Sequence, residues 1–281
     1  MPMNNRLMRP RQTLHPEALN WRNRVVANGG SVSGTTLNAV DRFVKAIHAA
    51  GIRDRFYRLN LFAGNSDASL NAVRTPLYRG PSLGGTQYGN AMDTNVNFVQ
   101  GDYAETGASG GLWYGGVGTN TSKYLDTGLT GTTLTAGNRH VAAYEVVATT
   151  TDYSPSVIAW SATAAMHGIG PWTNSATYAY RSANTIAAAP TATKTAGFWL
   201  GNDESSTSAR LWKNGQSAAF QSGLSPGGSA TAAYSVFAIP ANELSEAKLG
   251  GYSIGLSMTN QQISDFYTAM QAFQTALGRQ V

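Results

Sequence analysis

The residues of this 281-residue chain that could do chemistry are few and scattered. A Gly-x-Ser-x-Gly string at residues 107–111 matches the pattern that exposes a nucleophilic serine. That pattern needs a strand before the serine and a helix after it. Here the string lies in a glycine-rich turn, and Leu-Trp-Tyr at 112–114 has the composition of a strand. We therefore expect Ser109 not to act as a nucleophile.

The histidines and cysteines give no sign of a metal or cofactor enzyme. His15, His48, His140 and His167 share no metal-binding spacing, and no phosphate-cradling or dinucleotide fingerprint is present. The chain has no cysteine, which excludes disulfides and thiolate metal sites. We therefore assign no catalytic residue and expect no enzyme activity.

Basic side chains gather at the start of the chain. Residues 1–80 hold 12 Lys and Arg against 4 acids, whereas residues 81–281 hold 8 against 11. This imbalance favours an anionic partner, either nucleic acid or an acidic protein surface. Residues 1–15 lack periodicity and are typical of an extended arm. The residues that we expect to attach the chain to its partner are Arg6, Arg9, Arg11, Arg22 and Arg24.

The arm lacks the interleaved aromatic residues of single-strand binders and any known DNA-reading motif. We therefore expect it to dock on a neighbouring protein subunit rather than on nucleic acid, and to become ordered on binding. No apolar run reaches the roughly 18 residues of a membrane span. The first residues also lack the apolar core of a secretory signal.

The elements that must position these residues are mostly strands. Charged residues make up 12% of the chain and glycines number 31, a composition that favours short strands and tight turns. Strand-like runs recur every ten to fifteen residues from about Val96. Asn214-Gly215 between two such runs is a strong hairpin signal, because both residues tolerate positive φ.

Helices are expected at the two ends of the chain. His-Pro-Glu at 15–17 starts a helix that ends near residue 27, and a second runs from about residue 35 to Gly51. Thr259 and Gln262 form a capping-box pattern before a helix with one apolar face. This face could cover a sheet or meet the helix at 37–47, and we expect the second. Residues 52–80 lack the regular spacing of apolar residues that marks a helix or a strand. We expect them to form an irregular segment that packs on the domain built from the strands.

Three strand segments carry a resemblance to a known fold. Leu-Trp-Lys-Asn-Gly-Gln at 211–216, the run at 123–128, and Tyr-Ser-Ile-Gly at 252–255 before an Ile-x-x-Phe-Tyr helix resemble the laminin-G/concanavalin A-like jelly rolls. The resemblance spans roughly residues 95–281. It implies a mainly β protein, a concanavalin A-like jelly-roll sandwich with an N-terminal helical hairpin and a C-terminal helix. The expected divisions are the arm (1–15), an attachment region (16–94) and the jelly roll (95–281).

The front of the chain adds a second resemblance. The segments 60–64 and 97–103, together with the preceding helices, resemble tailed-bacteriophage proteins that pair a helical N-terminal region with such a jelly roll. This implies a structural protein of the virion, on its tail, baseplate, fibres or capsid surface. That family has no agreed catalytic motif, so no functional residue is transferred from it.

The jelly-roll resemblance also implies two kinds of binding site. Lectin-like jelly rolls often hold calcium at the rim of the sandwich, for which the candidate ligands are Asp126, Asp203 and Glu204. Acids in turns more often cap backbone or face solvent. Sugars stack on exposed aromatic rings, and the candidate glycan contacts are Trp172, Tyr178 and Tyr180. Aromatic residues of strands also build cores, so Trp172, in a loop, is the best placed for exposure.

These observations together predict a virion structural protein that binds other virion proteins and is present as a homo-oligomer or in multiple copies. The alternative is a carbohydrate-binding module that recognises a host-surface glycan. A glycan-degrading enzyme is a third reading, which would need two carboxylates converging about 5 to 9.5 Å apart.

Overall fold

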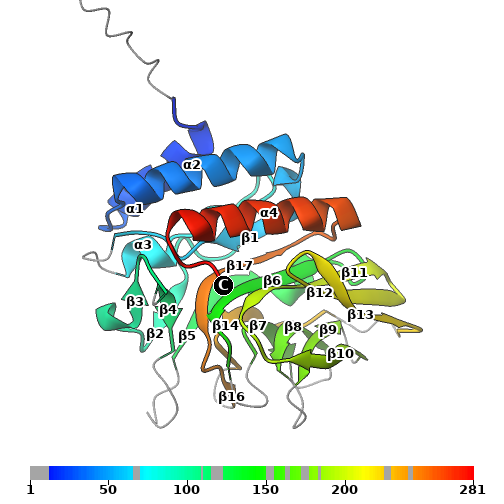
Figure 1. The fold of residues 1–281 in the computed structure, drawn as a ribbon. Helices are drawn as coiled ribbons and strands as arrows, with labels where there is room; N and C mark the ends of the chain where they lie inside the picture. Colours follow the sequence, from blue (N-terminus) through cyan, green and yellow to red (C-terminus); the bar gives the residue numbers. More distant parts are fainter. Residues whose placement is uncertain are drawn as a thin grey trace, which may run out of the picture.

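The computed structural model describes residues 13–65, 70–108, 110–114, 123–149, 155–161, 165–171, 177–182, 185–224, 229–239 and 243–281. Two antiparallel sheets face each other, and a layer of helices covers the outer face of one of them (Figure 1). This confirms the predicted mainly β sandwich with an N-terminal helical pair and a C-terminal helix. Among the described residues, no helix has the length and apolar character needed to cross a bilayer.

The sheet beneath the helices, here the first sheet, has eight strands. Its spatial order is β13 (Gln216–Ser222), β12 (Ser208–Lys213), β11 (Gly197–Ser205), β6 (His140–Val147), β17 (Lys248–Gly255), β4 (Gly111–Trp113) and β3 (Tyr103–Ala104). The eighth strand, β1 (Phe56–Asn60), pairs antiparallel with β17.

The second sheet has seven strands and no helical cover among the described elements (Figure 1). Its order is β10 (Thr185–Thr193), β9 (Thr177–Ser182), β8 (Ala165–Pro171), β7 (Val157–Ser161), β14 (Ala233–Val236), β5 (Tyr124–Thr130) and β2 (Thr94–Val96). Smaller elements are η1 (Arg53–Arg55), α3 (Asn71–Arg74), η2 (Gln100–Asp102), η3 (Gly131–Thr133), β15 (Ala238–Ile239) and β16 (Glu243–Leu244).

The central strand β6 of the first sheet is buried on both faces. In β6, Val141 and Ala143 point into the core between the sheets, whereas Ala142, Tyr144 and Val146 point into the core under the helices. Successive side chains of a strand point to opposite faces, so a strand covered on both sides is expected to be mostly apolar. The apolar run from Val141 to Tyr144 in β6 therefore follows from the helical layer above it, although Glu145 is also buried in this strand.

The helical layer consists of α1 (Pro16–Ala27), α2 (Gly34–Ala49) and α4 (Asn260–Ala276). The predicted capping box is confirmed, since Thr259 and Gln262 each accept a hydrogen bond from the other's backbone N–H. The ring of Phe266 in α4 lies 6.5 Å from Phe43 of α2 and 5.1 Å from Phe198 of β11. The predicted contact of α4 with α2 is therefore present, and α4 also packs on the first sheet, so its apolar face meets both candidate partners.

The hairpin predicted at Asn214-Gly215 is confirmed. Asn214 has φ of 48° and Gly215 of 73°, and the turn joins β12 to β13. Positive φ at both central residues matches the right-handed twist of the flanking strands. The turn brings β13 back along β12 and makes it the edge strand of the first sheet.

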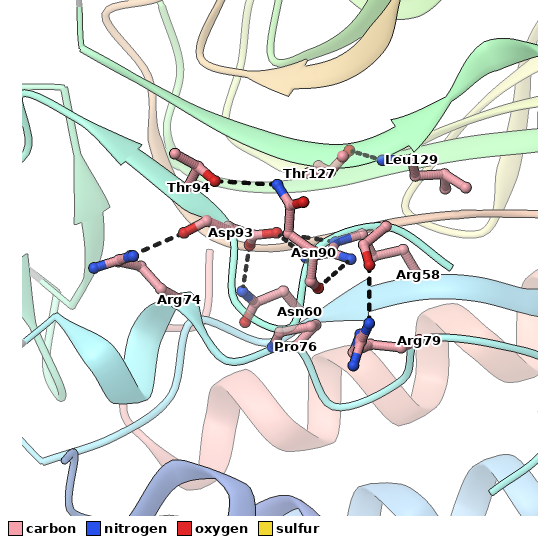
Figure 2. A network of polar contacts seen from close by, with 12 residues as sticks. Arg58, Asn60, Arg74, Pro76, Arg79, Asn90, Asp93, Thr94, Thr127 and Leu129 are labelled. Atoms are coloured by element: carbon pink, nitrogen blue, oxygen red, sulfur yellow. Dashed lines mark hydrogen bonds and ion pairs between the residues drawn. The ribbon is translucent and has the colours of Figure 1, made fainter. Parts of the chain in front are cut away.

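Residues 56–60 correct the expectation of an irregular segment, because they form β1. Arg58 and Asn60 are buried in this strand, at positions where apolar residues are usual. Their polarity breaks the hydrophobic pattern from which a strand is predicted. Both side chains bind the carboxylate of Asp93 (Figure 2). That carboxylate also accepts a bond from the Tyr252 hydroxyl. This network ties the N-terminal region to the first sheet.

Candidate functional site

A hollow of about 720 Å³ opens on the outer face of the first sheet, beside the N-terminal end of α4. Figure 1 shows this end of α4 above the part of the sheet formed by β11 to β13. Its lining is Arg55, Asp203, Glu204, Arg210 and residues 257–262. We call this space the α4 hollow. Two of the acids singled out from the sequence, Asp203 and Glu204, therefore border it.

The charges around the α4 hollow are balanced and paired. Glu204 Oε1 lies 2.5 Å from Arg210 Nε, and Asp203 Oδ2 lies 3.0 Å from Arg139 Nε. Asp203 and Glu204 are consecutive in β11, so their side chains leave opposite faces of the strand. Asp203 is only 1% exposed, whereas Glu204 faces solvent. The lining thus offers polar groups without a large net charge.

An exposed aromatic ring lies beside the hollow. Phe220 is 50% exposed and pairs across the β12–β13 ladder with Arg210, whose guanidinium carbon lies 4.6 Å from the ring centroid. Arg210 Nη1 also donates to Ser217 Oγ at 2.9 Å. Glu204, Ser217 and Phe220 thus all contact this guanidinium, and we call the surface that Arg210 and Phe220 form the ledge.

The wall opposite this ledge comes from the first turn of α4. Asn260 and Gln261 are exposed there, and Gln261 Nε2 donates to Asp265 Oδ1 at 2.9 Å. Below them, Asn202 of β11 exchanges hydrogen bonds with the backbone of Met258, which fixes the helix start over the sheet. The wall therefore presents carboxamides, which both donate and accept hydrogen bonds.

The three candidate calcium ligands do not converge in the structure. Asp126 lies on β5 of the second sheet, where its Oδ1 accepts a bond from Gly128 N at 2.8 Å. Asp203 and Glu204 belong to the first sheet, and both are engaged by arginines. These three carboxylates therefore do not share one site, and calcium binding by this chain stays a prediction.

Two of the three predicted glycan contacts are also wrong. Tyr178 and Tyr180 are fully buried, because both occupy inward positions of β9. Tyr178 stacks on Trp199 with ring centroids 4.1 Å apart, and the Tyr180 hydroxyl donates to Asp203 Oδ1 at 2.7 Å. Trp172 lies outside the described residues, as does Ser109 of the Gly-x-Ser-x-Gly string.

The predicted attachment arginines differ in their surroundings. Arg22 is exposed on α1, as attachment requires. Arg24 is used inside the molecule, since its two terminal nitrogens donate to the carbonyls of Pro76 and Leu77 at 2.8 Å each. This corrects its assignment to an external partner. Arg6, Arg9 and Arg11 lie outside the described residues.

The fold brings together a cluster that the sequence spacing did not reveal, because its histidines come from different helices. His48 Nε2 lies 2.7 Å from Glu17 Oε2, and His15 belongs to the same group. A metal ion there would meet the Arg53 guanidinium, 2.8 Å from Glu17 Oε1. It would also compete for His15 Nδ1, which accepts the backbone N–H of Glu17. The cluster fits a helix-linking ion-pair network better than a metal site.

Glu145 is the one described carboxyl whose pKa is strongly raised. Burial raises it to about 7, although Ser156 and Tyr178 donate to Oε1 and oppose the shift. The unfolded chain releases this proton near pH 4.5, so the folded state loses stability as pH rises from there to about 7.

We therefore expect Glu145→Gln, which mimics the neutral carboxyl, to be more stable than the wild type above pH 7. The gain should approach roughly 3 kcal/mol there and vanish below about pH 4. Urea unfolding of both proteins across this range measures it. A difference that does not change with pH would contradict the assignment.

Comparison with known proteins gives likenesses of shape only. No family model matches the chain, and no curated protein matches it. Domain 4 of AbnA, a GH43 extracellular arabinanase from Geobacillus stearothermophilus solved with arabinotriose, has a TM-score of 0.47 and 9% identity, covering 75% of this chain and 98% of that domain. The binding domain of Paraclostridial Mosquitocidal Protein 1 has a TM-score of 0.41 and 9% identity, covering 76% and 52%.

Trypanosoma rangeli sialidase in complex with 2,3-difluorosialic acid has a TM-score of 0.44 and 10% identity. The match covers 82% of this chain but only 39% of the sialidase. Likenesses at these levels leave the function to be argued from the residues of the α4 hollow and its ledge.

Proposed function

We propose that the chain is a carbohydrate-binding β-sandwich module whose binding surface is the α4 hollow with the ledge of Arg210 and Phe220. The observation that carries this proposal is a half-exposed aromatic ring beside an open polar hollow with paired charges. A sugar ring presents apolar C–H faces and many hydroxyls. An aromatic ring can stack on the C–H faces, and carboxamide and guanidinium groups can form hydrogen bonds with the hydroxyls.

The balance of charge supports an uncharged ligand. The lining residues include two arginines, Arg55 and Arg210, and two acids, Asp203 and Glu204, so the lining has no formal excess of either sign. Nucleic-acid binding draws its affinity mainly from basic groups on phosphates, which this hollow does not concentrate. The fixed Arg210 lowers the entropy lost when a ligand is bound, because the guanidinium is already oriented.

The same geometry favours binding without hydrolysis. Glycosidases use two carboxyl groups that flank the scissile bond, one of them able to donate a proton. Here Asp203 is buried beside Arg139 and Glu204 is paired with Arg210, on opposite faces of β11. Neither carboxyl is available as a general acid, so we assign a recognition role to this surface.

Removal of the aromatic ring tests the proposal. We expect Phe220→Ala to weaken the best glycan on an array by tenfold or more, about 1.4 kcal/mol, as measured by calorimetry. The matched control is Trp113→Ala. Trp113 is 40% exposed with Lys248 Nζ 5.2 Å from its ring, but it lies on β4, toward the other edge of the first sheet. An equal loss in both variants, or no glycan on the array, would overturn the proposal.

A structural role in a bacteriophage virion stays a prediction of the sequence resemblance. The strand β1 places the N-terminal region in the same sheet that carries the α4 hollow. Attachment of that region to a particle would then fix the direction in which the hollow faces. Location of the chain by particle reconstruction would test this role.

A further inference from the structure

A second hollow, of about 230 Å³, lies between α1, η1 and the segment at 77–87. Three arginines line it, Arg24 from α1, Arg53 from η1 and Arg79 from the segment, and its single acid is Glu17. At roughly 30 Å³ for each water, the space would hold about eight waters. That is room for a small molecule rather than a single ion.

The arginines keep donors that face no acceptor of the described chain. Arg79 donates to the Gly89 carbonyl through Nη2, and no bond from its Nη1 to a described residue is present. Arg53 binds Glu17 through Nε and the Gly80 carbonyl through Nη1, and no bond to its Nη2 is present. A guanidinium offers five N–H donors in a planar fork, so these two retain donors that match a carboxylate or phosphate.

The positive charge in this hollow is not compensated. Glu17 is already shared between Arg53 and His48, which leaves Arg24 and Arg79 without a carboxylate. Burial, together with repulsion from Arg79 and Arg58, lowers the pKa of Arg24 to about 10. Burial and Arg58 also lower the pKa of Arg79. A bound anion would relieve this repulsion.

We propose that the arginine-lined hollow binds a small hydroxylated oxyanion, a molecule of sugar size that carries a carboxylate, phosphate or sulfate group. The guanidiniums of Arg53 and Arg79 would receive the oxyanion. Asn20, Ser82 and Gln87 at the rim supply neutral groups for hydroxyls. This site is separate from the α4 hollow and does not depend on the function proposed there.

The variant Asn20→Asp tests the site with little change in shape. Asn20 Oδ1 accepts a bond from Arg24 Nε at 3.0 Å, and an aspartate oxygen at the same place keeps that bond. The added negative charge should partly neutralise the arginines and repel a bound anion. The matched control is Asn23→Asp, an exposed position of the same helix with the same change in net charge.

The probes are glucose 6-phosphate, glucuronate and inorganic phosphate, with glucose as the neutral comparison, titrated by calorimetry at low ionic strength where screening is weak. We expect saturable binding of at least one acidic sugar to the full chain and none of glucose. Asn20→Asp should bind that sugar at least tenfold more weakly, while the midpoint of its thermal unfolding is unchanged or higher. Asn23→Asp should stay within twofold of the wild type.

The sugar acids separate the two sources of the oxyanion. Preference for glucose 6-phosphate identifies a phosphate site, and preference for glucuronate a carboxylate site. Absence of binding by all three anions, or equal losses in Asn20→Asp and Asn23→Asp, would overturn the proposal. Phe220→Ala should leave this binding intact, so failure here and failure of the glycan surface are told apart.

Discussion

Asp93→Ala will lower the free energy of unfolding by about 3–5 kcal/mol, the usual cost of leaving one member of a buried ion pair without its partner. Arg58 and Asp93 are both fully buried, and Arg58 Nη2 lies 2.5 Å from Asp93 Oδ1. Burial alone would lower the pKa of Arg58, but Asp93 and the Tyr252 hydroxyl raise it above its ordinary value. The guanidinium therefore stays charged and loses its counter-ion in the variant.

The loss should spread across the molecule, because the Asp93 carboxylate links two strands, β1 and β17, to the segment that precedes β2. It accepts bonds from Arg58 and Asn60 of β1 (Figure 2). It also accepts a bond from Tyr252 of β17. Chemical denaturation followed by circular dichroism measures the change. The control is Asp54→Ala, whose exposed pair with Arg55 should contribute at most about 1 kcal/mol. A loss for Asp93→Ala no larger than the control's would refute this role.

Phe266→Asp will destabilise the protein by more than the roughly 3–5 kcal/mol typical of Phe→Ala in a core, because a buried charge is added to the cavity. The ring of Phe266 lies 4.9 Å from Phe56 of β1, and it also packs against Phe43 and Phe198. The substitution therefore removes a contact that α4 shares with both α2 and the first sheet.

We expect the helical layer and the sandwich to unfold together in this variant, with protease resistance lost in both. A helix that packed against α2 alone would instead let the N-terminal region loosen while the sandwich persisted. Ala272→Asp, at an exposed position of α4, is the control and should have a small effect. Two separate transitions, with the sandwich melting later, would contradict the shared core. Limited proteolysis during a urea titration distinguishes the two outcomes.

Local signals in the sequence predicted the elements that depend on local chemistry. The capping box of Thr259 and Gln262 marked the start of α4, and Asn214-Gly215 marked the β12–β13 turn. In both, side chain and backbone within a few residues decide the conformation. The sandwich could likewise be predicted from the spacing of short strands and from the resemblance that they carry.

Features that depend on distant partners could not be predicted in this way. Arg58 and Asn60 made β1 look irregular, because their partner Asp93 lies far along the chain. The inward direction of Tyr178 and Tyr180 depends on the register of β9. Phe220 gave no signal of its own, since its exposure follows from the edge position of β13 and from where α4 begins.

The most direct test of the central claim is to map the bound glycan on the full-length chain by backbone NMR. If the glycan binds in the α4 hollow, titration with the best array ligand will shift the amide signals of Arg210, Phe220, Asn260 and Gln261. Signals from the second sheet, such as those of Asp126 and Trp160, should stay in place. Shifts confined to the second sheet, with the α4 hollow unchanged, would contradict the account.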